Sequence, residues 1–380
     1  MNHTSRIIST YSADVFGACS ALFELGGMVI MHDASGCNST YTTHDEPRWY
    51  DMESMVYISG LSEMEAIMGD DEKLINDIVL AAEDLKPKFI AIAGTPIPTM
   101  TGFDFAAVAA LIEERTGIPA FGFPTTGMNS YVHRANMALE AIARRFTDKT
   151  AKRTESPSVN ILGLTPLDFT VNGTDVAIAR FLEDSGYRIL SRWAMGSSLE
   201  ELAQAGGAHV NLVVSATGLG AAKVLQEQFG IPYVMGVPVG PDYSAKIREA
   251  LAIAAATGEN QVLFSELPGQ DILIIGEVVT SLSLASALEL ASGKGVTVLC
   301  PTECDPGLLR NKDLQLQSEV EIQQAMAQAK LVIADPLYKP ICPREIPFLE
   351  LPSEAFSGRL FRDRIPNLIS DFQLYFREVL

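Results

Sequence analysis

The chain has 380 residues, of which 47% are hydrophobic and 20% are charged, and its formal net charge is −19. This length is too great for one ordinary core and predicts two or three domains of about 100–150 residues each. The negative charge argues against nucleic acid or an anionic membrane as a partner, because both attract concentrated Lys and Arg. No apolar run approaches the roughly 20 residues that a membrane helix needs.

The amino-terminal residues and the cysteines bear on the cellular compartment. Met1 to Arg6 lack the basic region and the apolar segment that mark a secretory signal. The five cysteines have irregular spacing, which favours free thiols or metal ligands over a disulfide framework. We therefore expect a cytoplasmic protein.

Short apolar runs rich in β-branched residues alternate with amphipathic stretches, which is the pattern of βαβ units. The predicted fold class is α/β, with three domains that each contain a mostly parallel sheet flanked by helices. The first domain, 1–155, ends in a polar segment at 147–158. Its predicted strands are Met28–His32, Phe89–Ala93 and Ala120–Phe123, and its predicted helices are Asp14–Leu25, Asp71–Leu85, Phe105–Arg115 and Val132–Phe146.

The rest of the chain is predicted to form a second domain over 156–265 and a third over 266–380, which includes a C-terminal extension. A polar stretch near 261–268 separates the two. The predicted strands of the second domain are Val159–Leu164, Tyr187–Arg192, Val210–Val214 and Tyr233–Gly236. Those of the third are Ile272–Ile275, Val296–Leu299, Leu331–Ala334 and Phe348–Leu351.

A proline-bracketed motif occurs once in each predicted domain, at Gly117–Pro124, Gly230–Pro238 and Glu345–Pro352. Each copy is an apolar strand with a proline at its start and another just beyond its end, where the missing N–H is tolerated. Strand punctuation alone would explain a single copy. Three copies, roughly one per domain, favour a repeated architecture.

The loop after the strand Met28–His32 carries Gly36 and Cys37. Ligands in open α/β sheets collect at the C-terminal ends of strands, so a thiol delivered there is well placed to bind a metal or cofactor. A buried core thiol is the alternative interpretation. Cys19 lies in a predicted helix and is the thiol nearest to Cys37 in sequence, although it too has the properties of a core residue.

The other candidate groups have simpler explanations. Cys300 and Cys304 are expected to be a strand-end residue and a loop thiol, because no third cysteine or histidine lies near them in sequence. The acidic segment that starts at Glu63 is expected to be a solvated loop, in which Asp70 or Asp71 caps the next helix. The chain lacks a Gly-x-x-x-x-Gly-Lys phosphate loop, a Gly-x-Ser-x-Gly elbow and the common zinc spacings.

These motifs, in this order and spacing, make the chain similar to component 1 of nitrogenase. That family also includes the catalytic subunits of dark-operative protochlorophyllide reductase and of the nickel-tetrapyrrole reductive cyclase. The family's cluster cysteine lies in a His-x-x-x-Gly-Cys loop, which matches His32–Cys37. Further matches extend over nearly the whole chain and lie at 63–74, 208–214, 228–232 and 346–352.

Three positions depart from the family pattern. The family commonly has a second cluster cysteine at the place of residues 93–96, and this chain has none there. The family's N-terminal cluster cysteine falls near Asp14, and the cysteine that binds the nitrogenase active-site cofactor falls at Ser215. The resemblance therefore argues against a nitrogenase P-cluster and an iron–molybdenum cofactor, and dinitrogen is not the expected substrate.

The resemblance implies an iron–sulfur cluster, most simply a [4Fe-4S] cluster shared across a subunit interface, because such clusters normally take four protein ligands. Cys37 with Cys19 or Asp14 from each of two chains would complete it. The partner would be a second copy of this chain or a related component 1 subunit. The residues expected to bind the cofactor are Gly36, Gly94, Thr95 and Ser215, and the segments expected to line the substrate cleft are 94–96, 215–218 and 353–356.

The implied activity is that of a nitrogenase-like oxidoreductase. Electrons would come from a separate ATP-dependent iron protein, since the chain has no phosphate loop, and would reduce a small unsaturated or tetrapyrrole-like substrate between the domains. The acidic surface suits docking to a basic patch on that protein. Two alternatives remain: a non-catalytic scaffold or carrier for metallocluster or cofactor assembly, and a binding protein without a cluster.

Overall fold

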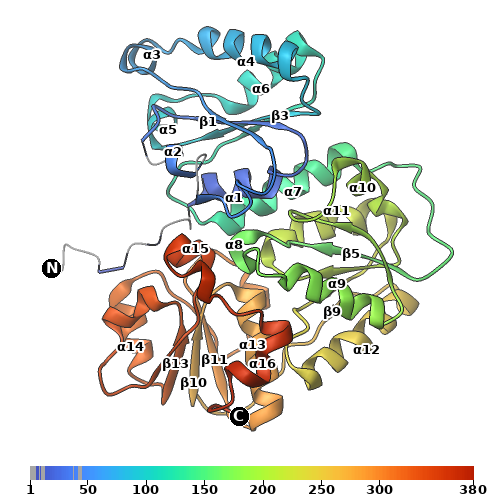
Figure 1. Ribbon diagram of the computed structural model, residues 1–380, viewed down its shortest axis with the longest axis vertical. Coiled ribbons are helices and arrows are strands. Elements are labelled where there is room, and N and C mark those ends of the chain that lie inside the picture. The colour runs from blue at the N-terminus through green and yellow to red at the C-terminus, as the bar shows by residue number, and fades with distance from the viewer. Residues whose placement is uncertain (1–5, 8, 10–12, 37, 42–44) are drawn as a thin grey trace.

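The computed structural model describes residues 6–7, 9, 13–36, 38–41 and 45–380. In this part of the chain the strands form three sheets, and helices pack against them (Figure 1). Every strand pair within these sheets is parallel. The α/β fold class with three parallel sheets is therefore confirmed. We refer to each sheet with its helices as the first, second and third unit.

The first sheet has the strand order β2-β1-β3-β4. Its strands are β1 (Met28–His32), β2 (Met55–Ile58), β3 (Ile90–Gly94) and β4 (Ala120–Phe123). The three predicted strands are confirmed. The edge strand β2 was not predicted. It is short and mostly not buried, so its extended conformation depends on pairing with β1 more than on its own hydrophobic pattern.

The side chains of β1 and β3 alternate between two cores, because successive residues of a strand point to opposite faces. The even-numbered residues of these strands pack against α4 (Asp71–Leu85) and α6 (Phe105–Thr116). The odd-numbered residues face α1 (Asp14–Leu22) and α7 (Tyr131–Phe146). Figure 1 shows α4 and α6 above the sheet and α1 and α7 below it. The first sheet is thus buried on both faces.

Helix α1 ends at Leu22, earlier than the predicted Leu25, and every residue in it is buried. Its packing against α7 is close at Gly17, where a Cβ atom would lie 2.1 Å from the carbonyl oxygen of Tyr131. Helix α7 also packs against α11 (Leu219–Phe229) of the second unit. The α1–α7 layer therefore joins the first unit to the second.

The second sheet has the order β6-β5-β7-β8-β9 and the third has the order β12-β11-β10-β13-β14. The strands of the second sheet are β5 (Ser158–Leu162), β6 (Arg188–Arg192), β7 (Val210–Val213), β8 (Tyr233–Met235) and β9 (Gln261–Val262). Those of the third are β10 (Ile272–Ile275), β11 (Val296–Cys300), β12 (Leu314–Gln315), β13 (Leu331–Ala334) and β14 (Phe348–Glu350).

The longer helices of these two units are α9 (Thr174–Asp184), α11, α12 (Pro241–Thr257), α13 (Val278–Ser292), α14 (Glu319–Met326) and α16 (Leu368–Tyr375). The shorter helices of the whole chain include α2 (Asn38–Thr40), α3 (Glu63–Met68), α5 (Pro96–Thr101), α8 (Pro166–Phe169), α10 (Leu199–Ala203) and α15 (Glu354–Ser357). No helix in the described part of the chain is long and apolar enough to cross a membrane.

The three proline-bracketed strands occupy equivalent positions. In each sheet the first strand in sequence (β1, β5 or β10) lies between two later strands. One of these two neighbours is β3, β7 or β13, and the proline-bracketed strand pairs with the other edge of that neighbour. β4, β8 and β14 are those three strands. The motif therefore marks one position of a repeated sheet topology.

The three sheets use residues 28–123, 158–262 and 272–350, so each falls inside one predicted domain. The domain boundaries near 155 and 265 remain predictions. The C-terminal extension does not stay with the third unit alone, because α16 packs against α9 of the second unit.

The acidic segment at 63–71 is not the solvated loop that we expected. Helix α3 forms there because Ser62 and Glu65 make a capping box, in which each side chain accepts a hydrogen bond from the backbone N–H of the other residue. Gly69 ends the helix in the left-handed conformation, at φ 68°. Asp70 then caps α4 by accepting from the N–H of Lys73, as predicted.

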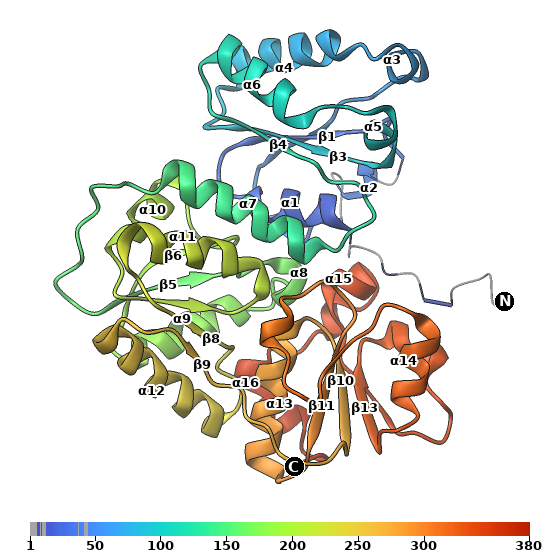
Figure 2. The ribbon, with the colours of Figure 1, turned by 180° about the vertical axis from the view of Figure 1, so that it is seen from behind.

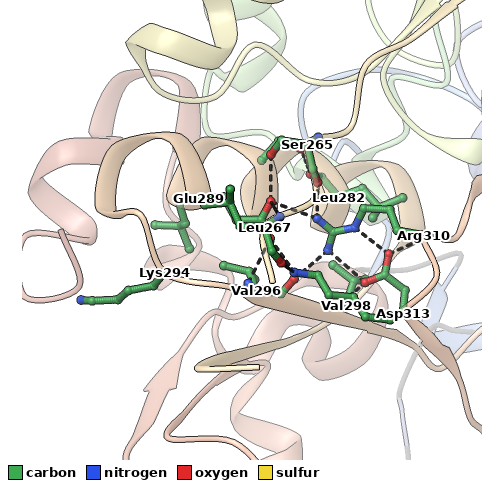
Figure 3. Close-up of polar contacts among 12 residues, drawn as sticks. Ser265, Leu267, Leu282, Glu289, Lys294, Val296, Val298, Arg310 and Asp313 are labelled. Carbon is green, nitrogen blue, oxygen red and sulfur yellow. Dashed lines mark hydrogen bonds and ion pairs between the residues drawn. The ribbon is translucent and has the colours of Figure 1, made fainter. Parts of the chain in front are cut away.

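A buried ionic network holds the segment between the second and third sheets (Figure 3). Arg310 donates to both Glu289 and Asp313, at 3.3 and 2.8 Å, and to the carbonyl oxygen of Ser265. The Arg310 side chain is 5% exposed and both carboxylates are 0% exposed. Because Ser265 lies just after β9, the network fastens this connection to α13.

We expect Arg310→Met to lower the free energy of unfolding by about 3–5 kcal/mol, because it leaves buried carboxylates without their arginine. Urea unfolding followed by circular dichroism measures this change. Arg145→Met is the matched control, since the Arg145 pair with Glu113 is about half exposed and exposed pairs contribute at most about 1 kcal/mol. Equal losses in the two variants would contradict a stabilising role of the buried network.

Candidate functional site

Each sheet has one place where the chain leaves neighbouring strands in opposite directions, and ligands of open α/β sheets bind at such places. These positions lie at the C-terminal ends of β1 and β3, of β5 and β7, and of β10 and β13. Figures 1 and 2 show α8 and α15 where the three units meet, and the two helices contact each other. The residues that follow these strands are therefore the candidates for a functional site.

At the first position, hydrogen bonds brace the loop that follows β1. The hydroxyl of Thr95 donates to Asp33 Oδ1 at 3.0 Å and to the carbonyl oxygen of His32 at 3.2 Å. Asn38 donates to Asp33 Oδ2 at 2.6 Å. His32 Nδ1 lies 2.9 Å from the hydroxyl of Ser59, and burial lowers the pKa of His32 to about 4, so its imidazole is neutral at pH 7. The loop is thus braced on both sides of Cys37, which itself lies outside the described residues.

The predicted cofactor residues Gly36, Gly94 and Thr95 have different surroundings. Gly36 has φ 59° and no described atom within 4 Å of where its Cβ would lie, so the loop is open there. At Gly94 the ring of Phe105 occupies the space of a side chain, because a Cβ atom would lie 2.1 Å from that ring. Gly94 therefore serves close packing, and Thr95 braces the loop.

Asp14, the N-terminal residue of α1, is fully buried. Its two carboxylate oxygens accept hydrogen bonds from the N–H groups of Thr126 and Gly127, at 2.9 and 2.7 Å. Asn129 donates to it at 3.4 Å, and Arg134 lies 3.8 Å away. The carboxylate thus holds the loop between β4 and α7, and both of its oxygens are engaged in hydrogen bonds there.

Cys19 is 0% exposed and lies in the core between α1 and its neighbours. Burial and the nearby carboxylate of Glu46 raise the pKa of the Cys19 thiol well above its usual value. Because the thiolate is the form that binds metals, Cys19 does not fit a ligand role in this structure. The described residues contain no group of three or more His, Cys, Asp or Glu side chains placed to hold a metal.

The second and third positions meet at a pocket, which we call the interdomain pocket. Its wall includes α8, the start of α13 and the segment after β14, together with residues that precede and begin α16. Most of the lining side chains are apolar, and the polar ones are Asp168, Thr174, Glu277, Thr280, Ser281, Asp335 and Ser353. The volume of the cavity is about 90 Å³.

Three carboxyl groups reach this pocket from strand ends. Glu277 follows β10 and accepts from the N–H of Ala216 at 2.9 Å and from that of Thr280 at 2.8 Å. Asp168 lies in α8, after β5, and accepts hydrogen bonds from the hydroxyls of Tyr131 and Thr165. Asp335 follows β13 and accepts from the N–H groups of 337 and 353.

Burial raises the pKa of all three carboxyl groups. Burial, with a contribution from Asp168, raises the pKa of Glu277 to about 8. Burial also raises the pKa of Asp168 and of Asp335, against hydrogen bonds that favour their ionised forms. Two carboxylates close together cannot both ionise freely. The pocket wall therefore holds at least one exchangeable proton at neutral pH.

The predicted residue Ser215 is fully buried and hydrogen-bonds to Asp168, so it lies behind the pocket wall. Ser353 and Phe356 line the pocket, as predicted for the cleft. Gly94 and Thr95 do not line it and belong to the first position instead. Of the three predicted cleft segments, 353–356 lines this pocket and 94–96 and 215–218 do not.

The sequence analysis did not single out Asp168, Glu277 or Asp335. A usable signal exists for two of them, because Glu277 follows the apolar strand β10 after one glycine and Asp335 directly follows β13. Polar residues at the ends of parallel strands are candidates by the strand-end rule. Asp168 and Tyr131 carry no such signal, since their contact joins the first and second units.

Glu277→Gln tests the raised pKa. In the wild type, the unfolded state releases the Glu277 proton above pH 4.5 and the folded state keeps it up to pH about 8, so stability is lost as the pH rises through this window. Urea unfolding at several pH values should show a loss of up to about 5 kcal/mol that the variant lacks. Glu155→Gln, at an exposed site, should keep the wild-type pH dependence. An unchanged dependence in Glu277→Gln would contradict a buried protonated carboxyl.

Comparison with known proteins adds two kinds of similarity. One subunit of the light-independent protochlorophyllide reductase of Nostoc punctiforme is 29% identical over 204 residues, which cover 50% of this chain and 39% of that protein. NifE of Clostridium pasteurianum, a nitrogenase iron-molybdenum cofactor biosynthesis protein, is 29% identical over 182 residues, which cover 47% of this chain and 38% of that protein. The matched region thus spans less than half the length of these relatives.

The solved structure of nitrogenase Cp1 at pH 6.5 superposes with a TM-score of 0.70 at 17% sequence identity, and covers 100% of this chain and 94% of that one. This similarity shows a shared fold. The model of the nitrogenase component 1 type oxidoreductases matches residues 14–289, which include all of the first two sheets and the start of the third. The chain therefore belongs to the nitrogenase component 1 type oxidoreductase family.

Proposed function

We propose that the chain is the substrate-binding subunit of a nitrogenase-like reductase. In this proposal it receives electrons from an ATP-dependent iron protein and reduces a small unsaturated molecule in the interdomain pocket. The observation that carries the proposal is the buried carboxyl group of Glu277 at the pocket wall, with a pKa of about 8. Family membership and the oxidoreductase relatives support the same class of activity.

Reduction of an unsaturated bond consumes protons as well as electrons, so the site must hold protons away from bulk water. Glu277 keeps a proton at neutral pH, and Asp168 lies close enough to raise its pKa. The hydroxyl of Tyr131 donates to Asp168 and orients that carboxyl group. An iron–sulfur cluster, when bound, would supply electrons one at a time. The small cavity, about 90 Å³, favours a small substrate over a tetrapyrrole.

The cluster would be shared across a subunit interface, with Cys37 as the ligand from this chain. The fully buried Cys19 and the hydrogen-bonded Asp14 argue against a larger contribution from the described residues. Since a [4Fe-4S] cluster normally takes four protein ligands, the second subunit would supply most of them. That subunit would be another component 1 chain, and the complex would work in the cytoplasm.

An exposed apolar surface near the first position supports such a partner. Helices α3 and α5 contact each other, and α5 begins just after Thr95, which braces the Cys37 loop. The α3–α5 patch consists of Met64, Ile67, Met68, Ile97 and Met100, which are between 42% and 86% exposed. Apolar side chains gathered in this way are typical of protein–protein contacts.

The second candidate function is that of a scaffold for cofactor assembly, and the similarity to NifE favours it. The two functions share the fold and differ in turnover. ATP-dependent and iron-protein-dependent reduction of a substrate supports the reductase. Stoichiometric transfer of a bound cluster to another protein, without turnover, supports the scaffold.

Cys37→Ala should abolish iron binding. Protein purified anaerobically from its native cells should contain iron and acid-labile sulfide and absorb visible light in the wild type, and all three signals should fall to background in the variant. Cys342→Ala is the matched control, because Cys342 is a free, partly exposed cysteine outside the predicted ligand set. Equal iron in the wild type and Cys37→Ala would exclude Cys37 as a required ligand.

Cys19→Ala separates a core residue from a ligand. Deleting one buried atom of this size should lower the free energy of unfolding by about 1 kcal/mol. The iron content per chain should stay at the wild-type value, measured on the same anaerobic preparations. Loss of iron together with wild-type stability would restore Cys19 to the ligand set.

Ile67→Glu in the α3–α5 patch should weaken association with the second subunit by at least about tenfold, because it places a charge in an apolar contact. Sedimentation of the complex purified from native cells measures the shift toward the 41.1 kDa single chain. Leu80→Glu is the control, since Leu80 is 65% exposed on α4, outside the patch. A complex that survives Ile67→Glu and dissociates with Leu80→Glu would place the interface elsewhere.

A further inference from the structure

The interdomain pocket has a charge pattern that bears on the kind of ligand it takes. Asp168, Glu277 and Asp335 reach its wall, and the described residues that line it include no Lys, Arg or His. An anionic ligand would therefore face carboxyl groups without a compensating cation. A neutral or cationic ligand would not incur that penalty.

The same region does pair another buried carboxyl group with an arginine. Glu354 is 1% exposed and pairs with Arg362 at 2.6 Å. Arg192 is similarly engaged, 3.7 Å from Asp175. Asp168 and Glu277 have hydrogen-bond donors but no such partner among the described residues. An ionised carboxylate in this pair would therefore have no positive charge beside it from the described residues, and a cationic ligand would supply one.

A free hydroxyl group on the wall provides a second, independent observation. Ser281 is 5% exposed, lines the pocket and has no side-chain hydrogen-bond partner among the described residues. Its Oγ lies over Gly276, where a Cβ atom would be only 2.7 Å away, and Gly276 also lines the pocket. Because this hydroxyl lines the pocket and has no partner among the described residues, it is free to donate to a ligand or to accept from one.

The remaining wall suits an organic cation better than a metal ion or a hydrated one. Phe169 and Phe356 line the pocket with aliphatic side chains around them. Aromatic faces attract ammonium groups, and aliphatic side chains bury an alkyl chain. The cavity of about 90 Å³ restricts the ligand to a small molecule.

We propose that the interdomain pocket binds a small alkyl- or alkenylammonium ion, whose N–H groups donate to Asp168, Glu277 and Ser281. As the substrate class of the reductase, this inference rests on the proposed function. The binding step itself needs neither the cluster nor the iron protein. The pocket rejects carboxylates and phosphates of the same size.

Isothermal titration of the full chain with three matched probes tests the proposal: propylammonium, propanol and propionate. We expect the wild type to bind propylammonium at least about tenfold more tightly than propanol, and to show no saturable binding of propionate. Asp168→Asn should weaken propylammonium binding by at least about tenfold. Asp175→Asn, a carboxylate outside the pocket lining, should bind as the wild type does.

Circular dichroism shows whether Asp168→Asn is folded, and Ser281→Ala provides a milder variant that should weaken binding without affecting the fold. Propionate binding as tight as that of propylammonium, or no saturable binding of any probe to the wild type, overturns the inference. Propylammonium binding without any iron-protein-dependent turnover of an unsaturated amine contradicts the reductase, but it supports the proposal that the pocket binds a small ammonium ion. Turnover of a neutral or anionic substrate without ammonium binding supports the reductase and contradicts the proposed ligand class.

Discussion

Two buried hydrogen bonds to carboxyl groups join the three units of this protein. Tyr131 of the first unit donates to Asp168 of the second, and Glu277 of the third accepts from the backbone of Ala216 in the second. Burying carboxyl groups is costly unless each finds donors, so these groups hold the units in one arrangement. The same cost raises the pKa values that suit the site to proton transfer. Assembly and the proposed chemistry thus depend on the same atoms.

The repeated topology explains why the site lies where it does. Each sheet starts from an interior strand and adds strands to both sides, so polar loops gather at three equivalent strand ends. Two of these places share the interdomain pocket, and the first one holds the Cys37 loop apart from it. This division separates a place for substrate from a place for electron entry, as the proposed function requires.

The first unit shows how structural and functional demands compete for the same residue types. Asp14 and Cys19 lie on the helix that the packing buries most completely, and their polar groups are used inside the chain. The open space at Gly36 and the exposed α3–α5 patch lie on the outside of the same unit. A cluster at this position would accordingly rely on a second subunit, which would also cover the apolar patch.

The sequence by itself determined the α/β class, the strands with long apolar runs such as β1, β3 and β10, and the three proline-bracketed strands. Their patterns are local and survive without neighbours. Strands β2, β9 and β12 were not predicted, because they are short and their extended conformation depends on pairing with the adjacent strand. Helix α3 was also missed, although its capping box is visible in the sequence at Ser62 and Glu65. Only the tertiary structure decided that Tyr131, Asp168 and Glu277 meet, because hydrogen bonds between distant segments leave no periodic trace in the chain.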